Sequence, residues 1–444
     1  MLGKLPSKST VPFLHIQIFL PSYVTTEWKG KLLRALVQLS AGCVFLSGWN
    51  IWAIMSRYSP SDRYYMFDDI NRWNPLASFT RPSLAECADE PAIRDSINNF
   101  KVEALFDYSL LKCGYHRQKI IQFGGIAPII EDEDETHFAT EPCHLEYRRR
   151  TRGTSIEATY SMEVPVALTR YSYPNFKFDV VSTKLFLAML CRFIDNERRF
   201  YRFDIERIRD LIIIKEAPYG DARASKTYLQ GALDILTGRI KNPETWYSRA
   251  NMDYRQVSLC QFGTKRILLR QNIDLAEPFP SGPIHTPVHE DQSSSGDGPK
   301  AAFIPILENA VKSASEIDGS SDQPDPMVDI NGSRVTIMGP VVPEPPIKPI
   351  EVMCRSFQRF SFANLQIKWP NMVFSGADRI VSVLHLRGLI DHKPKSFSFE
   401  EIAPKGYKDT LARAWILCRE IIDFIMAIDR EHDRLALMWH VFNS

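Results

Sequence analysis

The sequence has almost no net charge, because its 444 residues carry 54 Lys and Arg against 53 Asp and Glu. A chain without excess charge has no overall attraction for nucleic acid or membranes, and any such binding must come from a local patch. Closely spaced cysteines are also lacking, since the eight Cys include no CxxC pair. This spacing disfavours a zinc site or a disulfide framework. It favours reduced, mostly buried thiols in an intracellular protein of the cytoplasm or nucleus.

No uninterrupted apolar run reaches the length of a membrane span. Residues 32–55 come nearest and contain Trp49 and Trp52, but polar residues such as Arg34 interrupt them. We expect residues 1–60 to form a poorly defined N-terminal extension, either a peripheral helix or a disordered segment. Membrane association through residues 32–55 is a less favoured alternative, and no small-residue cleavage site points to secretion.

Two short apolar segments each contain one carboxylate. Residues 257–275 predict a hairpin around a Gly-Thr-Lys turn, and its second strand closes on Asp274. Residues 350–356 predict another strand, with Glu351 near its start. A carboxylate at a buried strand end is costly unless a metal ion or a cation meets it. Two such strands side by side would form half of a divalent-metal site, and Asp274 and Glu351 are therefore the candidate catalytic residues.

Apolar periodicity divides the chain into one domain with an insertion. We expect its first part over residues 83–277 and its second part over residues 347–430, with a C-terminal tail at 431–444. Residues 278–346 are rich in Ser, Gly, Pro and Asp and predict a long flexible insertion. Helices are expected at 182–194, 227–240 and, most clearly periodic, 410–428. Strands interleaved with these helices predict an α+β fold, a mixed β-sheet flanked by helices.

Basic residues are the candidate phosphate contacts. An acidic block at 131–135 is followed by Arg148, Arg149, Arg150 and Arg152, and such blocks of opposite sign are usually solvated loops. The alternative is contact with phosphates of RNA or a nucleotide, because arginine offers a planar, bidentate fork to phosphate oxygens. Two further candidates lie on the predicted hairpin; salt bridging or solvent exposure on a strand edge is equally open for them. They are Arg266 and Arg270.

The order of these segments resembles the DXO-type decapping nucleases of fungi. The resemblance covers residues 83–429 through spacing and apolar pattern, with the Gln-Phe-Gly turn of the hairpin and the Pro/Gly turn after residue 119. It implies a fold related to the PD-(D/E)xK nucleases. It also implies cleavage of phosphodiester bonds near the 5′ end of RNA with Mg²⁺ or Mn²⁺. An RNA 5′ end or a nucleotide is the expected ligand, a protein partner is a further candidate, and DNA is not expected.

The resemblance also implies where the metal ligands stand and where the family pattern breaks. The Glu-x-Asp motif falls on Asn272 and Asp274, and the Glu/Asp-x-Lys motif falls on Glu351 and Met353. Asn272 can still offer a carbonyl oxygen to a metal, but Met353 can neither orient water nor offset phosphate charge. We therefore expect weakened or lost hydrolysis. Two hypotheses stay open: a metal-dependent RNA 5′-end hydrolase, and a non-catalytic RNA-binding or scaffold protein.

Overall fold

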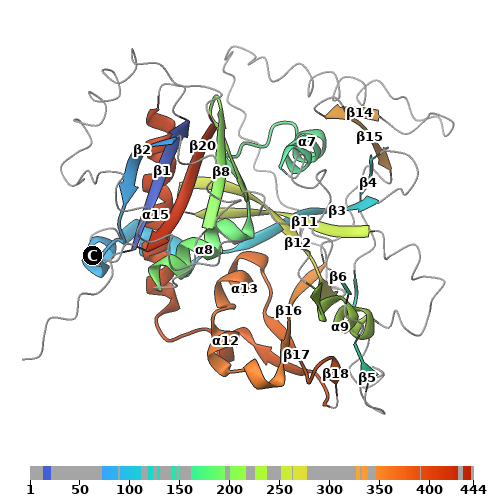
Figure 1. Cartoon of the computed structure of the whole chain (residues 1–444). Coiled ribbons are helices and arrows are strands. Elements are labelled where there is room, and N and C mark those ends of the chain that lie inside the picture. Colours follow the sequence, from blue (N-terminus) through green and yellow to red (C-terminus); the bar gives the residue numbers. More distant parts are fainter. Residues whose placement is uncertain are drawn as a thin grey trace, which may run out of the picture.

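The computed structural model describes residues 14–21, 73–88, 91–111, 119–123, 128–130, 143–145, 148–149, 162–195, 201–216, 226–237, 252–262, 264–277, 327–330, 333–338, 347–390, 392–428 and 434–441. Their largest element is a 12-stranded sheet with parallel and antiparallel neighbours, which confirms a mixed sheet (Figure 1). Its strands, in spatial order, are β14 (Met327–Ile330), β15 (Ser333–Met338), β4 (Lys119–Phe123), β3 (Val102–Leu111), β11 (Met252–Phe262), β12 (Lys265–Asn272), β7 (Val180–Thr183), β9 (Leu211–Glu216), β8 (Tyr201–Ile208), β20 (Arg434–Val441), β1 (Leu14–Pro21) and β2 (Trp73–Phe79).

A second sheet of four strands lies beside the first. It is formed by β13 (Leu275–Glu277), β16 (Lys348–Ser356), β17 (Arg379–His385) and β19 (Lys395–Ser398). Two small ladders pair β10 (Lys226–Thr227) with β6 (Arg148–Arg149), and β18 (Leu389–Ile390) with β5 (Cys143–His144). The predicted hairpin is confirmed, since β11 and β12 pair up to Phe262 and Lys265.

Helices cover the sheets and bury the main core. They are α4 (Leu84–Ala88), α5 (Pro91–Asn98), α7 (Glu163–Ser172), α8 (Lys184–Ile194), α9 (Leu229–Leu236), α12 (Phe362–Gln366), α13 (Trp369–Ser375), α14 (Phe399–Ile402) and α15 (Tyr407–Ala427), with a 3₁₀ turn, η4, at Phe357–Arg359. Helix α8 is buried from Phe186 to Ile194 and packs against α13 and α15 (Figure 1). The expected helices at 182–194 and 410–428 are thereby confirmed, and the helix expected at 227–240 is shorter.

The ends of the described chain belong to the large sheet. Strand β20 comes from the segment expected to be a tail and lies between β8 and β1, while β1 comes from the expected N-terminal extension. The apolar pattern that predicts β1 is short, because Ile16 and Ile18 alternate with Gln17 over few residues. Strand β1 pairs with both β20 and β2, and Ile16 and Ile18 are fully buried. The sheet thus extends beyond the limits expected at residues 83 and 430.

The expected flexible insertion, residues 278–346, also contributes to the sheet. Its hairpin of β14 and β15 extends the sheet next to β4. The rest of the insertion lies outside the described residues, as does the segment 32–55. In the described part of the chain, no helix is long and apolar enough to cross a membrane.

The described cysteine side chains are free thiols, as expected. Cys87, Cys191, Cys260 and Cys418 are buried, and Cys354 is partly buried. Burial raises the pKa of Cys354 to about 12 and that of Cys191 and Cys260 well above the ordinary value. Because the thiolate is the reactive form, these cysteines are packing residues.

Candidate functional site

The two sheets meet at Asp274. Strand β12 ends at Asn272 in the large sheet, and β13 begins at Leu275 in the smaller one. Strand β13 pairs antiparallel with β16 and sets Leu275 against Ile350. Asp274 directly precedes Leu275 and Glu351 directly follows Ile350, so both acidic positions adjoin this pair where the sheets join.

Lys184 reaches the same place from a third element. Strand β7 runs parallel to β12, and Thr183 pairs with Arg270. Helix α8 starts directly after this pair, which puts Lys184 at the sheet edge where β12 ends. Its Nζ forms an ion pair with Oε1 of Glu351, and the two side chains are only 18% and 11% exposed. The Glu351 carboxylate is thus neutralised by an ammonium group.

A second lysine approaches the same carboxylate. Lys368 is the N-cap residue of α13, and its charge acts on Glu351. Burial by itself would raise the pKa of Glu351. The charges of Lys184 and Lys368, with hydrogen bonds from Lys184 and Ser375, outweigh burial and leave this pKa below its ordinary value. Glu351 is therefore ionised at neutral pH.

Ser375 links Glu351 to a buried polar network between the sheets. Ser375 lowers the pKa of Glu351, its Oγ donates to the carbonyl oxygen of Met372 at 3.2 Å, and its backbone carbonyl accepts a 3.2 Å hydrogen bond from Nε2 of Gln271. The same Gln271 amide donates to Oε1 of Gln256 at 2.7 Å. Hydrogen bonds between buried polar groups help to specify one arrangement of the elements they join, and in this network only Oε1 of Gln271 lacks a partner among the side-chain atoms of Gln271, Gln256 and Ser375. This network holds α13, β11 and β12 in place around the carboxylate.

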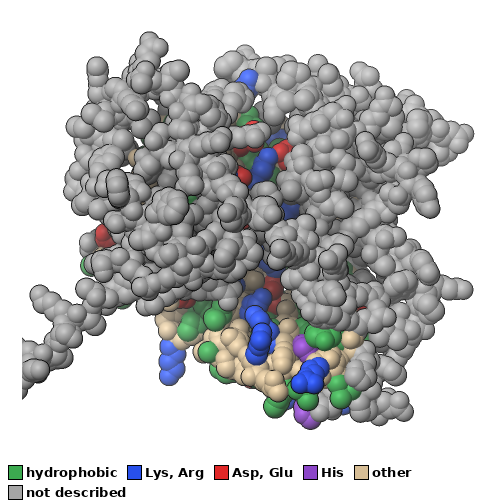
Figure 2. Space-filling model, viewed as in Figure 1, with side chains coloured by type: hydrophobic (Ala, Val, Ile, Leu, Met, Phe, Trp, Pro, Cys, Tyr) green, Lys and Arg blue, Asp and Glu red, His purple; other side chains and the backbone are tan. Residues whose placement is uncertain are grey.

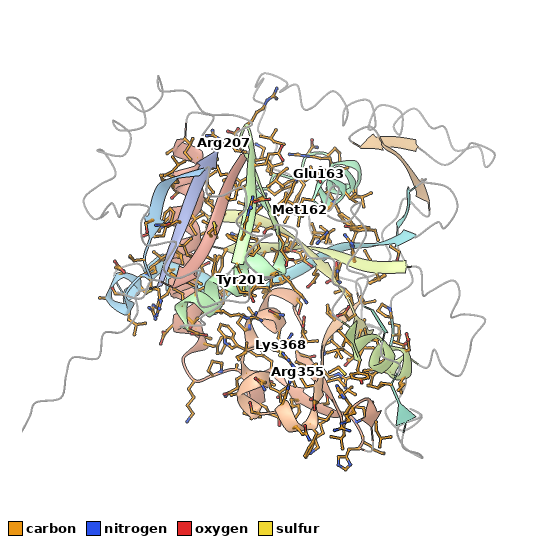
Figure 3. All side chains as sticks on the ribbon, in the orientation of Figure 1. Met162, Glu163, Tyr201, Arg207, Arg355 and Lys368 are labelled. Atoms are coloured by element: carbon orange, nitrogen blue, oxygen red, sulfur yellow. The ribbon has the colours of Figure 1, made fainter. Side chains whose placement is uncertain are left out.

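The surroundings of Lys368 are strongly basic. Burial chiefly lowers the pKa of Lys368, and Arg192, Lys184 and Arg355 lower it further, while Glu351 alone raises it. Arg192 is buried on α8 and donates from Nη2 to Oδ1 of Asn371 at 3.0 Å. Arg355 is exposed at the end of β16, and Figure 3 labels it beside Lys368, on which its charge acts. Lys184 and Lys368 thus act on the carboxylate of Glu351, and Arg192 and Arg355 act on Lys368.

This set of groups does not fit Mg²⁺ or Mn²⁺ well. Hard divalent cations take several oxygen ligands, with carboxylates supplying most of the charge. Among the described residues, no cluster of three or more His, Cys, Asp or Glu side chains is placed to hold a metal. A metal ion at Glu351 would also have to displace Lys184 and bind beside Lys368. The chemistry of this donor set favours an anion.

The two positions that differ from the expected motifs have different surroundings. Met353 is 3% exposed and belongs to the main core. Asn272, the expected third metal ligand, is exposed at the end of β12, whereas its neighbour Gln271 points inward to Ser375. The lysines beside the Glu351 carboxylate come instead from α8 and from the start of α13.

The arginines proposed as phosphate contacts are scattered. Arg266 donates its backbone N–H to Oδ2 of Asp179 at 2.7 Å, and its guanidinium lies 5.2 Å from the ring centroid of Phe176. Eight positions of extended chain, about 26 Å, separate Arg266 from Asp274. Arg270 is half-buried beside Thr183, much nearer the site. Arg148 and Arg149 form β6, with side chains outside the described set, and Arg150 and Arg152 lie outside the described residues.

Three residues beside Glu351 were not predicted from the sequence. Lys184 follows the buried strand β7 and is the first residue of the buried helix α8, and a lysine between two apolar segments needs a partner. The position of Lys184 between two apolar segments could therefore have been recognised in the sequence. Lys368 stands just before Trp369-Pro370, where proline marks a helix start, but nothing local connects it to Glu351. Ser375 offered no signal at all.

Comparison with known proteins adds structural likeness only. No family model and no curated protein matches this sequence. A mutant of S. pombe Rai1 in complex with 3′-FADP aligns with a TM-score of 0.41 and 10% identity over 78% of this chain and 95% of that one. K. lactis Dxo1 in complex with manganese aligns with a TM-score of 0.41 and 10% identity over 76% of this chain and 89% of that one. Candida albicans Rai1 in complex with pU5-Mn²⁺ aligns with a TM-score of 0.37 and 10% identity over 78% of this chain and 91% of that one. The functional argument therefore rests on the residues of this chain.

Proposed function

We propose that this chain is a divergent, DXO-type decapping-nuclease-like protein. It binds the phosphate-bearing 5′ end of RNA beside Glu351, and its metal-dependent hydrolysis is weakened or lost. One observation is central to this proposal: the counter-charges of the buried Glu351 carboxylate are ammonium groups, Lys184 and Lys368. The position of Asp274 and Glu351 on either side of the Leu275–Ile350 pair supports the relationship to the nucleases.

The charge balance supports binding of phosphate. Lys184 and Lys368 act on Glu351, and Arg192 and Arg355 act on Lys368, so three further cationic side chains influence the pKa of Lys368. A partly desolvated cationic site attracts anions more strongly than an exposed one, because the surrounding dielectric is lower. Arginine and lysine donors are also the usual partners of phosphate oxygens. The 5′ phosphate of an RNA is the ligand that combines this chemistry with the family resemblance.

The same charge balance argues against efficient hydrolysis. Metal-assisted cleavage needs acidic oxygens that hold a hard cation next to the scissile phosphate. Here the Lys184 ammonium already occupies the Glu351 carboxylate, and Asn272 replaces one acid of the expected motif. Loss of one charged group at such a site typically reduces a rate by roughly a hundredfold to a thousandfold.

Binding and cleavage can be tested on the same purified protein. We expect a 5′-phosphorylated RNA to bind more tightly than the same RNA with a 5′ hydroxyl. Lys368→Met should weaken binding of the phosphorylated RNA about tenfold, because a partly buried phosphate contact is lost. Lys348→Met is the matched control, since Lys348 lies on β16 but pairs with Asp378. Equal binding of both RNAs by the wild type would refute phosphate recognition.

The cleavage assay uses 5′-triphosphate, cap-lacking-methyl and NAD-capped RNA with Mn²⁺. We expect turnover at or near background for the wild type. Efficient cleavage that disappears in Glu351→Gln would instead identify an active metal-dependent nuclease. Absence of any RNA binding would point to the scaffold alternative.

A further inference from the structure

The segment that follows β16 exposes large apolar side chains. Phe357 in η4 is 58% exposed, and Phe362 and Ile367 around α12 are 45% and 38% exposed. Large apolar side chains that gather on a surface usually mark a site of interaction. We call the four residues Phe357, Arg359, Phe362 and Ile367 the aromatic–basic patch. They come from one short stretch of chain and lie on the same end of the molecule.

Basic residues alternate with these rings, and acidic residues are lacking. Residues 352–377 contain Arg355, Arg359 and Lys368 but no Asp or Glu. Arg355 and Arg359 are exposed. Figure 2 shows Lys and Arg side chains among hydrophobic ones on the lower face, where Figure 1 places α12. Positive charge interleaved with exposed aromatic rings is the chemistry that proteins use to hold single-stranded nucleic acid.

The patch is continuous with the site at Glu351. Along β16, every second residue lies on the same face of the strand, and this face contains Glu351, Met353 and Arg355. Phe357 follows just after the end of β16. Lys368 lies within electrostatic reach of both Glu351 and Arg355. A chain anchored by its phosphate near Lys368 would therefore meet Arg355 next and then the rings. The row of cations leads from the buried site to the exposed patch.

The two aromatic rings are held in position by neighbours. The centroid of Phe357 lies 6.4 Å from that of His392, with the rings edge to face. Phe362 packs in the same manner on Phe397, at 6.3 Å. A ring that is already oriented loses less rotational freedom when a base stacks on it. A base therefore stacks more favourably on these supported rings than on a ring that rotates freely.

We propose that the aromatic–basic patch binds the single-stranded RNA nucleotides that follow the 5′ phosphate. Phe357 and Phe362 stack on bases, while Arg355 and Arg359 contact the backbone phosphates. Stacking on phenylalanine tolerates any base, and the contact is expected to be independent of sequence. This inference rests on the proposed function, because it requires the 5′ end to be anchored beside Lys368.

A length series separates the patch from the anchor. Binding of 5′-phosphorylated oligouridines of two and of eight nucleotides is measured by fluorescence anisotropy with the full chain. The wild type should bind the octamer at least tenfold more tightly than the dimer. Phe357→Ala and Phe362→Ala should each weaken binding of the eight-nucleotide RNA about fivefold or more. Binding of the two-nucleotide RNA should stay unchanged. Arg359→Met should lower the slope of log affinity against log salt by about 0.7.

Two controls make the outcome decisive. Leu84→Ala removes an apolar side chain that is also 58% exposed, on α4, and should not alter RNA binding. Phe357→Tyr keeps a stacking ring and should retain the octamer affinity, which guards against misfolding of the alanine variant.

The possible failures of the two proposals differ. If both alanine variants bind the octamer like the wild type while Lys368→Met weakens both oligonucleotides, the patch proposal is refuted and the anchor stands. If the wild type binds neither oligonucleotide, the proposed function fails and the patch proposal with it. If the alanine variants change only self-association in sedimentation, the patch is a protein interface and our inference is wrong.

Discussion

At the scale of single residues, Glu351 links stability to pH. Its pKa is lowered in the folded state, and the ionised carboxylate therefore stabilises the fold above the ordinary glutamate pKa of about 4.3. This contribution is lost as the pH falls through the lower pKa of the folded state. We expect Glu351→Gln to be less stable than the wild type by about 1–3 kcal/mol at pH 7. The difference should shrink towards zero below pH of about 4.

Urea unfolding at several pH values measures this difference directly. Other carboxylates titrate in both proteins, and their effects cancel when the variant is subtracted from the wild type. A stability difference that stays constant down to pH 3 would show that the ion pairs with Lys184 and Lys368 contribute nothing.

Gly388 shows how a single backbone position is constrained. Its φ is +94°, a left-handed conformation that favours glycine, and an added Cβ would lie 2.6 Å from Cε1 of Tyr228. Gly406 also has a positive φ, +85°, but its nearest neighbour would be 3.6 Å away. Gly388→Ala should therefore destabilise more than Gly406→Ala, by about 1 kcal/mol or more. Equal shifts in thermal unfolding would contradict the clash with Tyr228.

At the scale of elements, Arg207 holds the end of the longest described helix, α15. Its Nη1 donates to the carbonyl oxygens of Met426 at 2.9 Å and Ile428 at 2.5 Å, and Figure 3 shows Arg207 near the end of β8. These carbonyls have no partner within the helix, and a cation there also complements the helix dipole. Arg207→Met should cost about 1.5–3 kcal/mol.

Chemical denaturation tests this cap. Arg207→Lys keeps the charge but offers a point donor in place of a fork, and it should recover only part of the loss. A methionine variant as stable as the wild type would mean that water replaces the guanidinium at no cost.

At the scale of the whole molecule, the sheet depends on strands from distant parts of the chain. Ile18 of β1 pairs with Leu437 of β20, and both side chains are fully buried. We expect Ile18→Ala and Leu437→Ala to destabilise the protein by about 2–5 kcal/mol each. Leu84→Ala, at an exposed position, should change stability by less than about 0.5 kcal/mol. Global unfolding monitored by circular dichroism provides the comparison.

If Ile18→Ala leaves the free energy of unfolding unchanged, β1 pairs with the sheet without contributing to its stability. Coupled losses in the double variant would support direct packing, because neighbours across two strands do not act additively.

Local patterns in the sequence predicted the elements that lie at the centre of the fold. The hairpin of β11 and β12, the helices α8 and α15 and the strand that contains Glu351 all follow from apolar periodicity and turn residues. The same patterns located Asp274 and Glu351 as the acidic positions of interest. Such signals are strong when they repeat over many residues, as along α15, and weak in a short strand such as β1.

Only the tertiary structure decided which groups surround Glu351. Lys184, Lys368 and Ser375 lie on three separate elements, and their meeting depends on the parallel register of β7 with β12 and on the packing of α13. No local pattern encodes such a meeting, because charges act through space and not along the chain. The sequence by itself determined which strands contain or adjoin the acidic residues Asp274 and Glu351. The fold decided that Lys184 and Lys368 lie beside Glu351.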